Sequence, residues 1–230
     1  MKVSVLTIAW KRFADFNLIL ENWLSEKEVD QVIVWDNSGQ FKTSLPNVLV
    51  LSLNKNLNSK WRFICSQLCK NDLIILADDD FIPKQGITED LLKHYDEDRL
   101  VGIKGRRLIG DTYYTSPTVG SDSISQSIKV DYLCSNILLT HRKHCVGVDV
   151  REIPTSLMDD WWWEHELAQK GITFWVVPTN KWVSILEQEY EFAQHLDPVM
   201  KEIREYYFKK WIKNENPEIP LSLRDKARLT

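Results

Sequence analysis

The sequence predicts an α/β fold with a mostly parallel β-sheet and a second half in which strands and helices are mixed. Four short apolar segments, rich in β-branched residues, have the character of buried strands. They span residues 3–8, 31–35, 48–53 and 73–77. Segments 13–24 and 59–69 carry apolar residues at helical spacing and lie between strands. Strands that alternate with helices in this way form a parallel sheet with right-handed crossovers.

The pattern changes after residue 105, where the polar stretch 118–127 predicts loops or short antiparallel strands. Further strands are expected at 101–104, 130–140 and 173–177, and further helices at 88–95, 160–170, 189–195 and 198–213. The aromatic residues of the last helix could close over an active site, pack on the sheet or touch a membrane surface, and we expect packing on the sheet. The chain has no repeat and no clear linker, so we expect one domain over residues 1–230. Its parts would be a parallel half (1–104), a mixed half (105–200) and a C-terminal helix and tail (201–230).

The bulk composition excludes several classes of protein. Hydrophobic residues make up 43% of the chain and charged residues 27%, which is typical of a soluble globular protein. The net charge of -4 argues against a general nucleic-acid-binding protein. The four cysteines show no zinc-like spacing with histidine, which predicts reduced thiols. No transmembrane stretch and no signal-peptide pattern is seen, so we expect a cytoplasmic protein.

Three consecutive aspartates, Asp78, Asp79 and Asp80, follow the most apolar predicted strand directly. Ligands of open α/β sheets collect at the carboxyl ends of the strands, so these carboxylates are expected at a binding edge. Like charges this close repel one another, and a hard divalent ion with oxygen ligands is the natural compensator. The alternative is an acidic turn before a helix that starts after Pro83. We favour the metal site.

The ends of the first two predicted strands should lie side by side in a parallel sheet. There, Asp36 would accept a hydrogen bond from a base or ribose, and the backbone at Thr7 and Ala9 would complement the base. Arg12 in the first loop would meet a phosphate. The alternative is an Asx-turn at Asp36 that only ends the strand, and this turn alone does not decide between the two.

Two basic segments predict contacts to an anionic ligand. Asn58, Lys60 and Arg62 lie at the expected start of a helix, where amides, cations and a helix N-terminus together suit a diphosphate. Asn-rich turns also arise for purely conformational reasons. Arg106 lies in a basic turn that could hold an anion but is more often solvated surface.

A final cluster combines acids and tryptophans at the start of a predicted helix. Asp159 and Asp160 are favoured there by the helix dipole, but either could also act as a general base or charge stabiliser beside an acceptor. Trp161 and Trp162 are candidate stacking surfaces for a sugar. Trp161 and Trp163 lie two residues apart on the predicted helix and cannot both face one core, so we expect at least one of them to border a cleft. His195 is a candidate third contact to a metal or phosphate.

Five segments in this order resemble the exostosin-like branch of nucleotide-sugar glycosyltransferases, whose Rossmann-like GT-A fold carries an Asp-x-Asp motif at a strand end. They are residues 58–63, 77–80, 101–106, 136–143 and 158–160. The resemblance implies that Asp80 binds Mn²⁺ or Mg²⁺, that Asp78 contacts ribose or sugar, and that Asp160 is the acid of the catalytic region. That family usually has Glu-Asp where this chain has Asp159-Asp160, and the tryptophans after it are unfamiliar.

By this resemblance the expected activity is metal-dependent transfer of a sugar from a nucleoside diphosphate sugar, most simply a UDP-sugar, to a glycan or other hydroxyl acceptor. Residues 1–104 would form the donor half and 105–200 the acceptor half. One alternative is a sugar nucleotidyltransferase, although the glycine-rich, basic phosphate loop of that class is missing near the N-terminus. Another is a non-catalytic sugar-binding module, which tryptophans and clustered acids would also suit.

Overall fold

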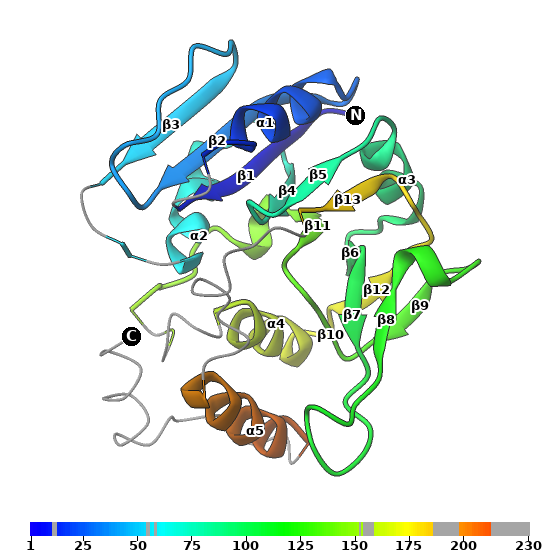
Figure 1. Ribbon diagram of the computed structural model, residues 1–230. Helices are drawn as coiled ribbons and strands as arrows, with labels where there is room; N and C mark the ends of the chain where they lie inside the picture. The colour runs from blue at the N-terminus through cyan, green and yellow to red at the C-terminus, as the bar shows by residue number, and fades with distance from the viewer. Residues whose placement is uncertain are drawn as a thin grey trace.

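The computed structural model describes residues 1–10, 13–53, 56–57, 59–151, 153, 159–185 and 198–212. Its largest element is an eight-stranded mixed sheet (Figure 1). In order across the sheet, the strands are β3 (Val48–Ser52), β2 (Val29–Asp36), β1 (Val3–Ala9), β4 (Leu73–Ala77), β11 (Ile137–His141), β6 (Arg99–Gly102), β12 (Thr173–Val176) and β9 (Ile128–Val130). The β3-β2-β1-β4 neighbours are parallel, as are β6 and β12, whereas β11 and β9 are antiparallel to their neighbours. The α/β class with a large, mostly parallel mixed sheet is therefore confirmed.

Helices and short strands complete the described structure. The α-helices are α1 (Phe16–Ser25), α2 (Arg62–Cys65), α3 (Ile87–His94), α4 (Asp159–Gln169) and α5 (Pro198–Ile212). Single 3₁₀ turns are η1 (Ser59–Trp61), η2 (Ser66–Leu68), η3 (Ser121–Ser123) and η4 (Arg142–His144). Two small sheets pair β5 (Phe81–Pro83) with β13 (Trp182–Ser184), and β7 (Lys104–Arg106) with β8 (Thr118–Gly120) and β10 (Tyr132–Leu133). No helix in the described ranges is both long and apolar enough to cross a membrane.

Several predicted elements need correction. The helix expected at 59–69 is broken into η1, α2 and η2, and the strand expected at 130–140 is divided among β9, β10 and β11. Apolar spacing cannot detect these breaks, because they follow from partners elsewhere in the chain: β10 pairs with β7, whereas β11 pairs with β4 and β6. The short strands β5 and β13 were not predicted. The helix expected at 189–195 lies outside the described residues.

The sheet separates two hydrophobic cores. Along β4, Leu73, Ile75 and Ala77 pack with α1 and α3 residues on one face, whereas Ile74 and Leu76 pack with α2 and α4 residues on the other. This alternation follows from the two-residue repeat of a strand. All five β4 residues are buried because neighbouring strands cover both edges and helices cover both faces. The strand therefore delivers the residues after Ala77 to the sheet edge from a rigid position.

A third core lies beneath α5, which packs beside α4 (Figure 1). Met200, Ile203, Tyr207 and Phe208 of α5 form a cluster with Trp161 of α4. The rings of Trp161 and Tyr207 have centroids 6.0 Å apart. The helix packs, as expected, but the predicted partner is wrong: α5 packs on α4 and the residues around it, not on the eight-stranded sheet.

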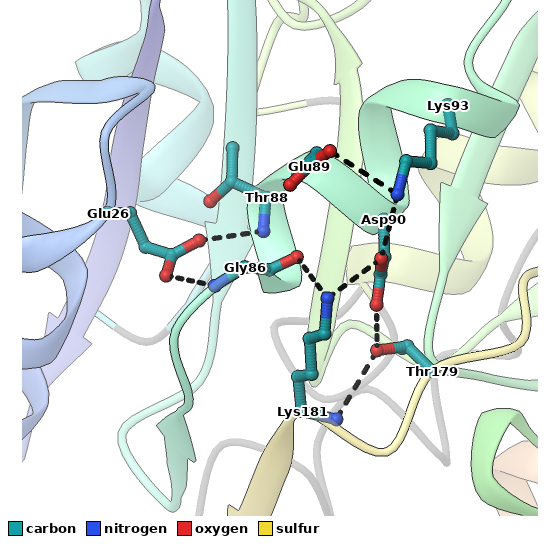
Figure 2. Close-up of polar contacts among 8 residues, drawn as sticks. All are labelled: Glu26, Gly86, Thr88, Glu89, Asp90, Lys93, Thr179 and Lys181. Atoms are coloured by element: carbon teal, nitrogen blue, oxygen red, sulfur yellow. Dashed lines mark hydrogen bonds and ion pairs between the residues drawn. The ribbon is translucent and has the colours of Figure 1, made fainter.

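Helix α3 is anchored at its N-terminus by a distant carboxylate (Figure 2). Glu26, which follows α1 and is 2% exposed, accepts hydrogen bonds from the backbone N–H groups of Gly86 (2.6 Å) and Thr88 (2.9 Å). Gly86 has φ 87°, a left-handed conformation that glycine adopts without strain. On the next turn, Asp90 accepts hydrogen bonds from Thr179 (2.8 Å) and Lys181 (3.0 Å). These contacts join α1, α3 and the segment before β13.

Candidate functional site

The aspartate triplet lies at the carboxyl end of β4, as predicted. Asp78, Asp79 and Asp80 are all partly exposed, in contrast to the buried strand that precedes them. The backbone N–H of Asp78 donates to Asn136 O (3.0 Å), which continues the pairing of β4 with β11. The backbone O of Asp80 accepts from Ile185 N (2.9 Å), just after β13. The triplet is thus held between two antiparallel neighbours.

The second acidic pair opens α4 and faces the same region. Asp159 is 4% exposed, and its Oδ1 accepts a hydrogen bond from Ser59 Oγ (2.7 Å). Asp160 is partly exposed, and its Oδ1 accepts from the backbone N–H of Trp161 (2.8 Å). The two acids therefore have different environments. Asp159 is tied to the η1 turn, whereas Asp160 keeps part of its surface open to solvent.

One buried cation joins the two acidic motifs. Arg62, which is 1% exposed, places Nη1 3.2 Å from Asp78 Oδ1 and Nη2 3.7 Å from Asp159 Oδ2. The other oxygen of Asp78 lies 3.4 Å from Asn136 Nδ2. The predicted catalytic pair and the predicted metal motif, which are far apart in sequence, thus meet at one guanidinium.

The single positive charge of Arg62 does not neutralise all the carboxylates around it. Burial raises the pKa of Asp78; the Arg62 guanidinium opposes this, and Asp80, Asp79 and Asp160 add to it. Burial likewise raises the pKa of Asp159 against the opposing effect of Arg62, and Asp160 adds to it. Water still reaches Asp78, whose side chain is 28% exposed. A further cation at this edge would favour the ionised form of both acids.

The acids fit a divalent metal only if a ligand completes the coordination. Across the described ranges, no group of three or more histidine, cysteine, aspartate or glutamate side chains is placed to hold a metal ion. Mg²⁺ in particular is often bound by one or two carboxylates together with substrate phosphates and water. Asp80 and Asp78 supply carboxylates of that kind. His195, the predicted third contact, lies outside the described residues.

The prediction that Asp36 binds a base or ribose is wrong in this structure. Asp36 is 0% exposed, and its carboxylate already accepts four hydrogen bonds. Oδ1 accepts from the N–H (2.9 Å) and Oγ (2.6 Å) of Ser38, and Oδ2 accepts from Phe41 N–H and Ser52 Oγ (both 3.0 Å). The alternative, a turn that ends the strand, is what the structure contains.

Thr7 and Ala9 are not placed to complement a base either. Both are 1% exposed in β1; β2 pairs with both residues, and β4 pairs with Thr7. Thr7 is paired with residues of both neighbouring strands, and Ala9 O accepts from Asn37 N–H (3.1 Å). Their backbone groups therefore serve the sheet and the following turn. Arg12 lies outside the described residues.

The predicted diphosphate cradle is only partly supported. Lys60 is partly exposed, but Arg62 is enclosed between Asp78 and Asp159 and does not reach solvent. The expected helix N-terminus is absent from the described chain here, because η1 and α2 are single short turns. Asn58 lies outside the described residues. Sequence spacing placed Arg62 near the site, but could not show that its partners are carboxylates.

Arg106 holds a loop of the mixed half of the chain instead of projecting into solvent. Its Nη1 donates to Tyr113 O (3.0 Å) and Ser116 O (2.6 Å), and its guanidinium lies 4.4 Å from the ring centroid of Tyr113. These contacts close the segment between β7 and β8. The prediction that Arg106 binds an anionic ligand has no support from its contacts.

The tryptophans after Asp160 divide between cores. Trp161 is 0% exposed in the cluster under α5, and Trp163 is 1% exposed on the sheet side of α4. They face different cores, as predicted, but neither borders a cleft, so Trp161 is not a stacking surface for a sugar. Trp162, between them, is partly exposed and remains a candidate.

Sequence analysis missed two polar residues, one in the site and one beside it. Asn136 contacts Asp78, and its position between two strands became visible only when the predicted strand 130–140 proved to be broken. Glu164, one turn after Asp160, is 0% exposed, and its Oε2 accepts from Leu133 N–H (2.6 Å). An acid inside an apolar helix face was the only sequence signal for Glu164.

Comparison with protein-family models gives no match to this chain, and comparison with curated proteins gives no significant match.

Proposed function

We propose that this protein is a metal-dependent glycosyltransferase with a GT-A-type fold, which moves a sugar from a nucleoside diphosphate sugar to a hydroxyl acceptor. The observation that carries the proposal is the meeting of Asp78 and Asp159 at Arg62, because it joins the strand-end acids to the acids of α4. Ligands of α/β sheets bind at this edge. A diphosphate is anionic, so an edge rich in carboxylates needs a bridging cation to accept it.

The donor side of the site would use the aspartate triplet. Mn²⁺ or Mg²⁺, held by Asp80 and Asp78 together with the diphosphate, would supply positive charge against the leaving group. The side chain of Asp78 is held in place by Arg62, which donates to Oδ1, and by Asn136 just before β11, which donates to Oδ2. Lys60, which was predicted to contact the diphosphate, is partly exposed and could bind a phosphate.

The acceptor side would use Asp160 and not Asp159. Asp159 is buried and held by Ser59 and Arg62, so its role is to position the start of α4. Asp160 is partly exposed and adjacent to it. In an inverting transfer, Asp160 would take the proton of the acceptor hydroxyl; in a retaining transfer, its charge would stabilise the cationic sugar. NMR of the anomeric product distinguishes the two.

The proposal is tested by incubating the protein with a panel of nucleotide sugars, a mixture of glycan acceptors and Mn²⁺, and measuring nucleoside diphosphate release. Asp80→Asn should lose metal-dependent donor binding and turnover, whereas Asp160→Asn should bind donor but fail to transfer. Asp111→Asn, at an exposed position in the loop between β7 and β8, is the matched control and should keep full activity.

Three results would contradict the proposal. The first is no release with any donor. The second is full transferase activity in the folded Asp80→Asn protein. The third is pyrophosphate formation from a nucleoside triphosphate and a sugar phosphate, which would indicate a nucleotidyltransferase. Saturable glycan binding without turnover would instead indicate a non-catalytic sugar-binding module.

A further inference from the structure

At the strand ends that were expected to bind a nucleobase, Asp36, Thr7 and Ala9 are not available to hydrogen-bond a base. Asp36 is saturated by protein donors, and Thr7 and Ala9 are enclosed in the sheet. The same edge instead carries two tryptophans, Trp35 at the end of β2 and Trp61 in η1.

These two indole rings form a stacked pair. Their centroids are 5.8 Å apart and their planes differ by 10°. Trp35 is 7% exposed, whereas Trp61 is partly exposed. Trp35 lies against the Trp61 ring, and Trp61 keeps part of its surface exposed to solvent. A flat ligand could therefore extend the stack.

The pair is held by specific contacts. Trp35 Nε1 donates to Asn37 Oδ1 (2.8 Å), and the backbone N–H of Leu57 donates to the same oxygen (3.0 Å). The amide of Asn37 thus orients the Trp35 ring and ties β2 to the segment that leads into η1. An aromatic surface fixed in this way loses little conformational entropy when a ligand stacks on it.

The stack is also connected directly to the acidic edge. Trp61 is followed by Arg62, which contacts Asp78 and Asp159, and Ser59 of the same turn contacts Asp159. Consecutive Cα atoms are about 3.8 Å apart, so Trp61 lies next to the arginine that contacts both acids. One nucleotide could span this region, with its base on the indole and its phosphates toward the aspartates.

We infer that Trp61, supported by Trp35, is the surface on which the nucleobase of the donor stacks. This inference rests on the proposed function and names the contact that replaces Asp36. Stacking on an aromatic ring tolerates different bases, because every base has a π-face. The contact therefore adds affinity for UDP and for ADP alike, and base selectivity must come from other groups.

The test measures binding of UDP, ADP and inorganic pyrophosphate by calorimetry with Mn²⁺ present, for wild type, Trp61→Leu and Trp61→Phe. Leucine keeps an apolar side chain without a π-face, whereas phenylalanine keeps a ring. Trp61→Leu should weaken the binding of UDP and ADP by about 5- to 160-fold, the range for loss of one base stack. Trp61→Phe should stay within about threefold of wild type, and pyrophosphate should bind all three proteins equally. Trp175→Leu, at a partly exposed position on β12, is the control and should bind UDP like wild type.

The outcomes separate the two proposals. If wild type binds neither UDP nor pyrophosphate, the proposed function fails and the inference fails with it. If wild type binds UDP and Trp61→Leu binds it equally well, the inference alone is wrong. A parallel loss of UDP and pyrophosphate in Trp61→Leu also overturns it, because the tryptophan would then act on the phosphate end or on the fold.

Discussion

The guanidinium of Arg62 lies 3.2 Å from the carboxylate of Asp78, with only 2% of the Arg62 side chain exposed. The same group faces Asp159 at 3.7 Å. Burial would lower the pKa of Arg62, but the nearby carboxylates of Asp159, Asp78 and Asp160 outweigh that effect and raise it. Arg62 therefore stays charged, and its first role is to hold two acidic motifs together.

Arg62→Met should destabilise the protein by about 3 kcal/mol, because removal of one partner leaves buried carboxylates without their cation. The free energy of unfolding from urea titration measures this. Lys60→Met is a matched control on the same turn, since Lys60 is partly exposed, and its effect should stay within about 0.5 kcal/mol. Equal stability of the two variants would show that Arg62 is not the structural link described here.

Asp36→Asn should destabilise the fold by about 2 kcal/mol without a specific effect on nucleotide binding. The amide –NH₂ cannot accept hydrogen bonds, so at least one donor now paired with Asp36 would be left buried and unsatisfied. Urea denaturation measures the loss, and calorimetry with UDP measures binding while the variant is folded. Asp15→Asn, at an exposed site with no side-chain cap bond, is the control. A stable Asp36→Asn protein with greatly weakened UDP binding would restore the base-binding role.

Glu26→Ala should cost about 2 kcal/mol, because it leaves the backbone N–H groups of Gly86 and Thr88 without their buried acceptor (Figure 2). Glu26→Gln should recover part of the loss, since its amide oxygen can still accept one of them. Hydrogen exchange at the start of α3 should rise in step with the loss of stability. Glu21→Ala, on the exposed face of α1, should leave both measurements unchanged.

Glu164 should make stability fall as pH rises. Burial raises the pKa of this carboxyl well above its ordinary value, Leu133 N–H opposes the shift, and Asp160 adds to it. Folded protein then keeps a proton that the unfolded chain loses above about pH 4.3, so stability is lost as pH increases through the range between the two pKa values. Glu164→Gln has no proton to lose, so its stability relative to wild type should increase with pH, by at most about 1.4 kcal/mol per pH unit.

Unfolding curves of wild type and Glu164→Gln between pH 5 and pH 8 (about one unit above the ordinary carboxyl pKa to well beyond it) measure this difference. A constant difference across that range would show that Glu164 is ionised in the folded protein. Glu166→Gln, two residues further along α4 and partly exposed, is the control for loss of a carboxylate from this helix.

Sequence reasoning succeeded where the signal was local. The apolar run of β4 predicted a buried strand, and the acids after Ala77 were correctly placed at its carboxyl end. The acidic start of α4 was predicted to within one residue. Sequence reasoning failed for Asp36 and Arg62, because an aspartate or arginine can bind either a ligand or other groups of the protein. Spacing does not show whether four donors already surround a carboxylate or whether an arginine is enclosed by acids.

The order of amino acids was therefore enough to specify the α/β class, the parallel strands and the position of the acidic triplet, because apolar periodicity and strand ends are properties of neighbouring residues. Contacts across the fold specified the rest: Arg62 between Asp78 and Asp159, the burial of Trp161 beneath α5, and the stack of Trp61 on Trp35. Each of these joins segments far apart in the chain. Their geometry depends on how the sheet and helices pack, and no local pattern encodes that packing.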